Sequence, residues 1–316
     1  MQKIGREDIQ IIAKHSNWSN EGVSKALEDH VYHKAKDWHQ FLKWLFLGLG
    51  ISFAVAGVIF FFAYNWDDLH KFVKLGIIGF LTIACVLGAL LTKTKPPIKK
   101  MLVTAASILV GVLLAVFGQV YQTGANAYEL FLNWTFFIAL WVVIVHFAPL
   151  WTVFVTLVNV TIVLYSEQVA HGWSGVFLFT LLFWVNTIIL VVFMLVGKWR
   201  ESLYLPTWFT HLLALAAITC ATLGNVNGIF DAVDSSYYLL TMTTLLVYAA
   251  GIWYGLSHKS PFYLSIIAFS LIVISSAYLI RLSDDAGMFL IISLYIITTI
   301  TLVIWALIKL HKKWNP

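Results

Sequence analysis

A short polar stretch between two apolar runs contains the densest group of chemistry-bearing side chains in this sequence. The stretch is Gly118–Glu129, with the sequence GQVYQTGANAYE. Polar side chains at membrane depth are costly unless they find a partner or line a water-filled cavity. The excess of amides, phenols and a carboxylate therefore indicates either a polar pocket or hydrogen bonding between helices, which contributes about 0.6 kcal/mol per contact.

In the pocket hypothesis, the polar side chains form hydrogen bonds to a ligand and nearby aromatic rings form the walls of the pocket. Gln119 and Gln122, spaced i, i+3 near the end of an apolar run, are expected to share one helical face. The hydrogen-bonding candidates are Gln119, Tyr121, Gln122, Asn126, Glu129 and Asn133, and the aromatic walls are Tyr64, Trp66 and Trp134.

A structural explanation covers part of the same stretch. Asn126 and Glu129 have the spacing of a capping box, in which each side chain satisfies a free backbone amide at the start of a helix. Gly124 would supply the turn before that helix. This explanation does not account for Gln119 and Gln122.

Two adjacent carboxylates, Asp67 and Asp68, form a second candidate site directly after Asn65 and Trp66. In a cavity such a pair could act as a general base or bind a divalent cation. As structural residues, either aspartate would cap the next helix and Trp66 would anchor the membrane interface. Because the sequence specifies neither a third ligand nor an acid partner, the structural interpretation is favoured and no metal site is predicted.

Signatures of well-known catalytic sites are missing from the chain. It has no Gly-x-Ser-x-Gly, no His-Glu-x-x-His and no phosphate-binding glycine loop, so no cofactor is expected. Cys85 and Cys220 lie in apolar segments and predict neither a disulfide nor a thiolate site. Asn159, Asn186 and His211 are the other polar groups within apolar runs. The sequence identifies no catalytic residues. It leaves open whether the chain is an enzyme, and it favours a protein that is not one.

The composition places these residues in a membrane protein. Of 316 residues, 60% are hydrophobic and 11% are charged, and the mean hydropathy is +0.86, outside the range of soluble domains. Apolar runs of about 18 or more residues predict membrane-spanning helices. The predicted fold is all-α and polytopic, with ten spans at Trp44–Tyr64, Phe72–Thr92, Met101–Tyr121, Leu130–His146, Leu150–Ser166, Ser174–Val196, Leu205–Gly224, Tyr237–Ser257, Pro261–Ile280 and Gly287–Lys309.

The orientation follows from the distribution of Lys and Arg. In this arrangement seventeen of the twenty lie on one side, and only Lys71, Lys74 and Arg281 lie on the other. The positive-inside rule therefore predicts that both termini are cytoplasmic and that the Gly118–Glu129 stretch faces outward. Because the basic residues gather at the span ends, nucleic acid is not an expected partner, whereas the lipid bilayer is.

Residues 1–40 form the one sizeable polar segment before the membrane domain at 41–316. They predict two helices, the second capped by Ser19 or Asn20. An apolar stripe that begins in this segment and runs into the first span is expected to pack on the protein's own cytoplasmic loops or to bind a protein partner. The stripe consists of Val23, Leu27, Val31, Ala35, Trp38 and Leu42.

The ordered motifs resemble those of a known family. They are an Asn-Trp-Asp loop after the first span and a Gly-Gln-x-Tyr-Gln-x-Gly motif before the fourth, between about Glu7 and Trp141. The chain is similar here to bacterial predicted integral membrane proteins catalogued as a domain of unknown function. The resemblance implies a bacterial inner-membrane location and brings no established activity. The matching positions are Asn65, Trp66, Gln119, Tyr121, Gln122, Gly124, Glu129 and Trp134.

Three functions remain open from the sequence. The leading hypothesis is an inner-membrane protein with an outward-facing polar pocket that binds or transports a small polar or lipid-linked substrate. A second is a membrane-embedded transferase or hydrolase acting on an envelope lipid or glycan, with Asp67, Asp68 or Glu129 as base. A third is a non-catalytic scaffold or sensor whose residues 1–40 recruit a partner.

Overall fold

All the regular secondary structure in the described part of the chain is helical. The computed structural model describes residues 6–31, 35–64, 69–91, 93, 95–199, 206–231, 235–282 and 286–314. Twelve helices occupy these ranges, and ten of them are long and apolar enough to cross a membrane. The all-α polytopic fold with ten spans, predicted from the sequence, is therefore confirmed.

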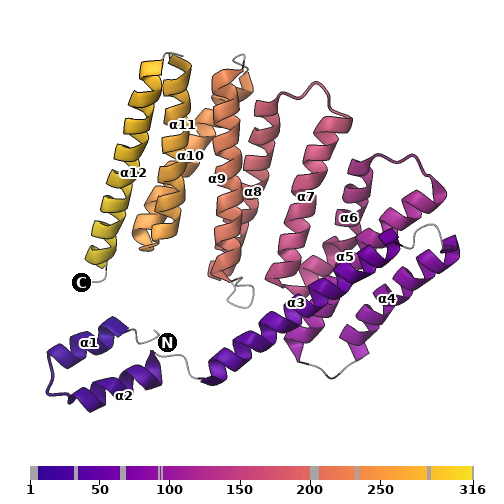
Figure 1. Ribbon diagram of the computed structural model, residues 1–316, viewed down its shortest axis with the longest axis horizontal. Coiled ribbons are helices and arrows are strands. Elements are labelled where there is room, and N and C mark those ends of the chain that lie inside the picture. The colour runs from indigo at the N-terminus through magenta and orange to yellow at the C-terminus, as the bar shows by residue number, and fades with distance from the viewer. Residues whose placement is uncertain are drawn as a thin grey trace. The chain divides into compact units, whose positions relative to one another are not determined.

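Two short helices precede the ten spanning helices (Figure 1). The short helices are α1 (Arg6–Lys14) and α2 (Asn20–His30). The long helices are α3 (Ala35–Tyr64), α4 (Lys71–Leu91), α5 (Pro96–Tyr121), α6 (Ala127–Val145), α7 (Ala148–Gln168), α8 (Gly175–Trp199), α9 (Thr207–Phe230), α10 (Ser235–Ser257), α11 (Pro261–Leu282) and α12 (Ala286–Trp314).

The chain forms two compact units, Met1–His70 and Lys71–Trp314. In the first unit, α1 contacts α2, and the hydroxyl of Ser19 accepts a hydrogen bond of 3.1 Å from the Gly22 amide, as expected of a helix cap. Helix α3 then runs without a break through residues 40 and 41. The domain boundary at that position stays a prediction.

In the second unit, consecutive helices pack side by side and alternate in direction (Figure 1). The loops after α5, α7, α9 and α11 therefore lie at one end of these helices, together with the start of α4. We call this end the α5–α6 face and the other end the opposite face. At the opposite face, the Lys100 ammonium donates a hydrogen bond of 3.1 Å to the His146 carbonyl, which follows the last residue of α6. The dipole of α6 favours a cation at this end of the helix.

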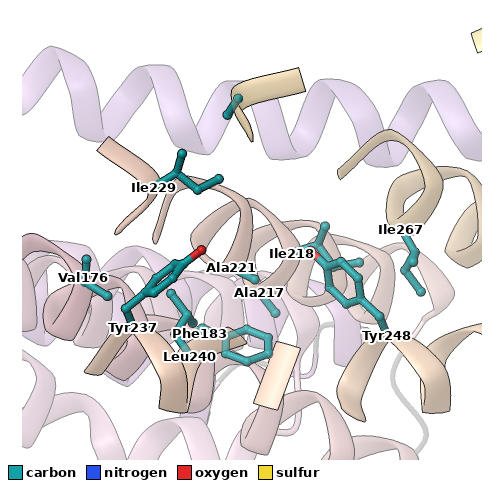
Figure 2. Packing of buried hydrophobic residues seen from close by; sticks show 11 residues of the cluster. Val176, Phe183, Ala217, Ile218, Ala221, Ile229, Tyr237, Leu240, Tyr248 and Ile267 are labelled. Carbon is teal, nitrogen blue, oxygen red and sulfur yellow. The ribbon is translucent and has the colours of Figure 1, made fainter. Parts of the chain in front are cut away.

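The largest core lies among α8, α9, α10 and α11. Phe183 of α8, Ala221 of α9 and Leu240 of α10 are fully buried in it, and Ile267 adds the contribution of α11 (Figure 2). Small residues let the helices approach, since a Cβ on Gly224 would lie 2.6 Å from Leu240. A separate core joins α6 and α7 through Ile138, Val142, Leu150 and Leu157, with side chains of α5 packed against it.

The end of α9 differs from the prediction. The span was expected to stop at Gly224, with Asn225 opening a loop, but the helix continues to Phe230. The Asn225 amide donates to the Ala221 carbonyl at 2.8 Å and to Thr244 at 3.2 Å, and its oxygen accepts from Thr241 at 3.0 Å. A polar side chain that usually favours turns is thus satisfied inside the helix bundle.

Candidate functional site

The end of α5 fixes the backbone of the candidate stretch. Gln122 follows the helix with φ 45°, in the left-handed region, and its backbone N–H donates a hydrogen bond to the Gly118 carbonyl. The Thr123 amide also reaches that carbonyl, at 3.2 Å, and Gly124 has φ 66°. These features end the helix in the manner of a left-handed C-terminal cap. Gly124 therefore supplies the turn, as predicted, whereas Gln119 and Gln122 do not share a helical face.

The start of α6 is capped by a residue from another helix. Asn126 occupies the N-cap position, but its side chain makes no capping hydrogen bond. Instead, Oε1 of Gln168, the last residue of α7, accepts a hydrogen bond of 3.0 Å from the Tyr128 amide. The predicted capping box is therefore wrong, although Glu129 does lie in the first turn, where the helix dipole favours a carboxylate.

Because backbone groups and Gln168 cap the two helix ends, the amide side chains of the stretch are available for other contacts. Gln119, Gln122 and Asn126 are all exposed on the second unit. Within the described part of the chain, no hydrogen bond engages the side chain of any of the three. Because other groups cap both helices, these amides are not needed to hold the backbone, and their donors and acceptors can bind something else.

Tyr121 joins the stretch to α4. Tyr121 is 46% exposed; its ring packs on Phe117 with the ring centroids 4.8 Å apart and lies 6.0 Å from the ammonium of Lys71. An ammonium at that distance is attracted to the face of an aromatic ring. Lys71 and Gln168 are thus two members of the site that sequence analysis missed. They lie about fifty and forty residues from their contacts, and a single sequence contains no signal of such pairing.

The remaining predicted residues fall into four groups. Glu129 is partly exposed and Asn133 is exposed, one turn apart on α6. Trp134 instead packs between α5 and α6, where its indole N–H donates to the Ser107 carbonyl at 2.7 Å and its ring lies against Gly111. Tyr64 is exposed at the end of α3, in the other unit. Trp66, Asp67 and Asp68 lie outside the described residues.

A row of aromatic rings continues from the stretch across the α5–α6 face. Tyr128 meets Tyr165 with ring centroids 5.3 Å apart, Tyr165 meets Trp173 at 5.5 Å, and Trp173 meets Phe177 at 5.0 Å. The rings come from α6, α7, the following loop and α8. Such contacts position the ends of these helices relative to one another, since aromatic pairs of this geometry are attractive.

Elsewhere several polar side chains in the helix interior bind one another. Asn159 and Asn186 exchange side-chain hydrogen bonds of 2.6 and 3.2 Å between α7 and α8. Ser270 of α11 contacts Thr222 of α9 at 2.6 Å and also bonds to the Tyr248 hydroxyl. These clusters act as connections between helices.

Two further groups on α9 and α11 have structural explanations. His211 stacks on Phe262 with the centroids 4.0 Å apart, which accounts for a histidine in this span. At the α5–α6 face, the Arg281 guanidinium donates to the Ile229 carbonyl near the end of α9. A cation at a helix C-terminus is favourable.

Comparison with known proteins places the candidate stretch inside a matched region. Residues 18–151 match a family described as "Predicted membrane protein (DUF2157)". The match confirms the family resemblance, and it covers α2–α6, including the whole of Gly118–Glu129. Neither the comparison with curated proteins nor the comparison with solved structures found a match.

Proposed function

We propose that this multi-pass membrane protein binds a small polar or lipid-linked ligand at the stretch Gly118–Glu129. The observation that supports this proposal is the set of unengaged amides on a fixed backbone. Gln119, Gln122 and Asn126 are exposed beside a membrane interface, and neither helix end uses their side chains. Polar groups that merely join helices would be paired, as Asn159 and Asn186 are.

The proposal includes a location and an orientation. The distribution of seventeen basic residues on one side and three on the other supports cytoplasmic termini and an outward α5–α6 face. The family resemblance supports a bacterial inner membrane. In that orientation, the ligand reaches the site from the outer leaflet or from the space outside the membrane.

Binding is the step that the geometry supports, and transport would extend it. Transport requires that the ligand also reach the opposite face, so it predicts uptake of the bound compound by proteoliposomes. Catalysis would require a base, and its candidates Asp67 and Asp68 lie outside the described residues. The scaffold function would rest on residues 1–40 and would not need Gln119 or Gln122.

A binding experiment on the full chain tests the proposal. The protein, purified in detergent and supplied with a bacterial polar lipid extract, is weighed by native mass spectrometry. The wild type should retain bound lipid, and Gln119→Ala together with Gln122→Ala should reduce that retention severalfold. Gln40→Ala, an exposed glutamine on α3, is the matched control and should retain as much as the wild type. Equal retention by all three proteins would reject binding at this stretch.

A further inference from the structure

The start of α4 adds positive charge to the candidate site. Lys71 is the first residue of α4, its ammonium lies 5.3 Å from the Phe72 ring and 6.0 Å from the Tyr121 ring, and the first turn contains no acidic residue. Helices α4 and α5 pack together in opposite directions, which brings Lys71 beside the end of α5. Gln119 and Tyr121 lie at that end of α5.

The position is unfavourable for a cation in two respects. The dipole of α4 repels positive charge at its first turn. Lysine is depleted on the outer side of membrane proteins, where the charge distribution places this end of α4.

The uncharged polar groups at the end of α5 suit an oxyanion. Gln119 and Gln122 offer amide N–H donors, and Tyr121 offers a hydroxyl. A phosphate group accepts several such hydrogen bonds, and its bond to an ammonium is charge-assisted and therefore stronger than a neutral one. An uncharged ligand would supply no negative charge to pair with the Lys71 ammonium.

We infer that the ligand carries an anionic phosphate group and that Lys71 binds this group beside Tyr121, Gln119 and Gln122. The inference rests on the proposed function, because it names the chemical class of the ligand at the same stretch. The phosphate belongs either to a lipid headgroup or to a free anion. The competing explanation is that Asp67 and Asp68, directly before α4, neutralise Lys71 without any ligand.

The test measures binding of defined probes to the full chain in detergent micelles. The probes are phosphatidylglycerol, phosphatidylcholine, which has no net charge, and inorganic phosphate. Lys71→Gln should weaken phosphatidylglycerol binding about tenfold, which corresponds to about 1.4 kcal/mol, and Lys71→Arg should restore most of it. Lys93→Gln, an exposed lysine beyond the other end of α4, is the control and should bind as the wild type does. The wild type should prefer phosphatidylglycerol to phosphatidylcholine, and added salt should weaken the preference.

The outcomes distinguish a lipid headgroup from a free anion as the source of the phosphate. They also distinguish failure of the phosphate inference from failure of the proposed function. Competition by millimolar inorganic phosphate would assign the site to a free anion, and its absence would assign it to a lipid headgroup. Unchanged phosphatidylglycerol binding in Lys71→Gln, while Gln119→Ala and Gln122→Ala reduce lipid retention, would overturn the inference and leave the proposed function. If only Asp67→Asn with Asp68→Asn lowers stability, and no probe responds to Lys71→Gln, the chain's own carboxylates neutralise Lys71 and the inference is wrong.

Discussion

Gln122 is the residue at which backbone geometry and side-chain chemistry can be separated. Its φ of 45° is a conformation that favours glycine, and a non-glycine residue there costs about 1 kcal/mol. Gln122→Gly should therefore leave the thermal unfolding temperature unchanged or raise it slightly, while lipid retention falls. Unfolding and native mass spectrometry in the same detergent measure both effects. A Gly variant that retains the ligand fully would show that the Gln122 side chain does not bind it.

Gly228 tests the close packing of α9 against α10. A Cβ at this position would overlap the Tyr237 ring, whereas a Cβ on Gly76 of α4 meets nothing within 4 Å. Gly228→Ala should lower the free energy of unfolding by about 1–3 kcal/mol, because overpacking a helix contact forces side chains to move. Gly76→Ala is the matched control and should be neutral or slightly stabilising. Equal unfolding temperatures for the two variants would contradict the described contact.

At the scale of elements, α7 and α8 are joined inside the membrane by the Asn159–Asn186 pair. Asn186 is fully buried, so removing Asn159 leaves one of its hydrogen-bonding groups without a partner. A double-mutant cycle with Asn159→Ala and Asn186→Ala should give a coupling energy of about 0.6–1.7 kcal/mol. Unfolding in mild detergent measures it. A coupling energy near zero would mean that the pair does not connect the helices.

The helices themselves follow from local signals, but their contacts do not. Apolar length predicts all ten spans, and prolines mark the starts of α5, α7 and α11. The prediction ended the ninth helix at Gly224, but the helix continues because threonines on α10 satisfy the Asn225 side chain. The polar stretch was found from composition alone. The contacts of Lys71 with Tyr121 and of Gln168 with Tyr128 depend on packing between helices, and no local pattern in a single sequence predicts them.

For the whole molecule, the proposed orientation is testable by thiol labelling. Cys85 and Cys220 are the two native cysteines, so Cys85→Ala with Cys220→Ala gives a cysteine-free background. Thr123→Cys, at the exposed α5–α6 face, should react with a membrane-impermeant maleimide in intact spheroplasts. Ser257→Cys, at the opposite face, should react only after lysis. The reverse pattern would place the candidate stretch in the cytoplasm and reject an outward-facing site.

The most direct test of ligand binding is an experimental structure of the full chain in lipid nanodiscs made with bacterial polar lipids. We predict density for a bound molecule that contacts the side-chain amides of Gln119 and Gln122 and lies beside Tyr121 and Lys71. Such density would identify the ligand's polar groups directly. A dry cluster in which these side chains bond only to other residues of the protein would contradict the account and make the stretch a connection between helices.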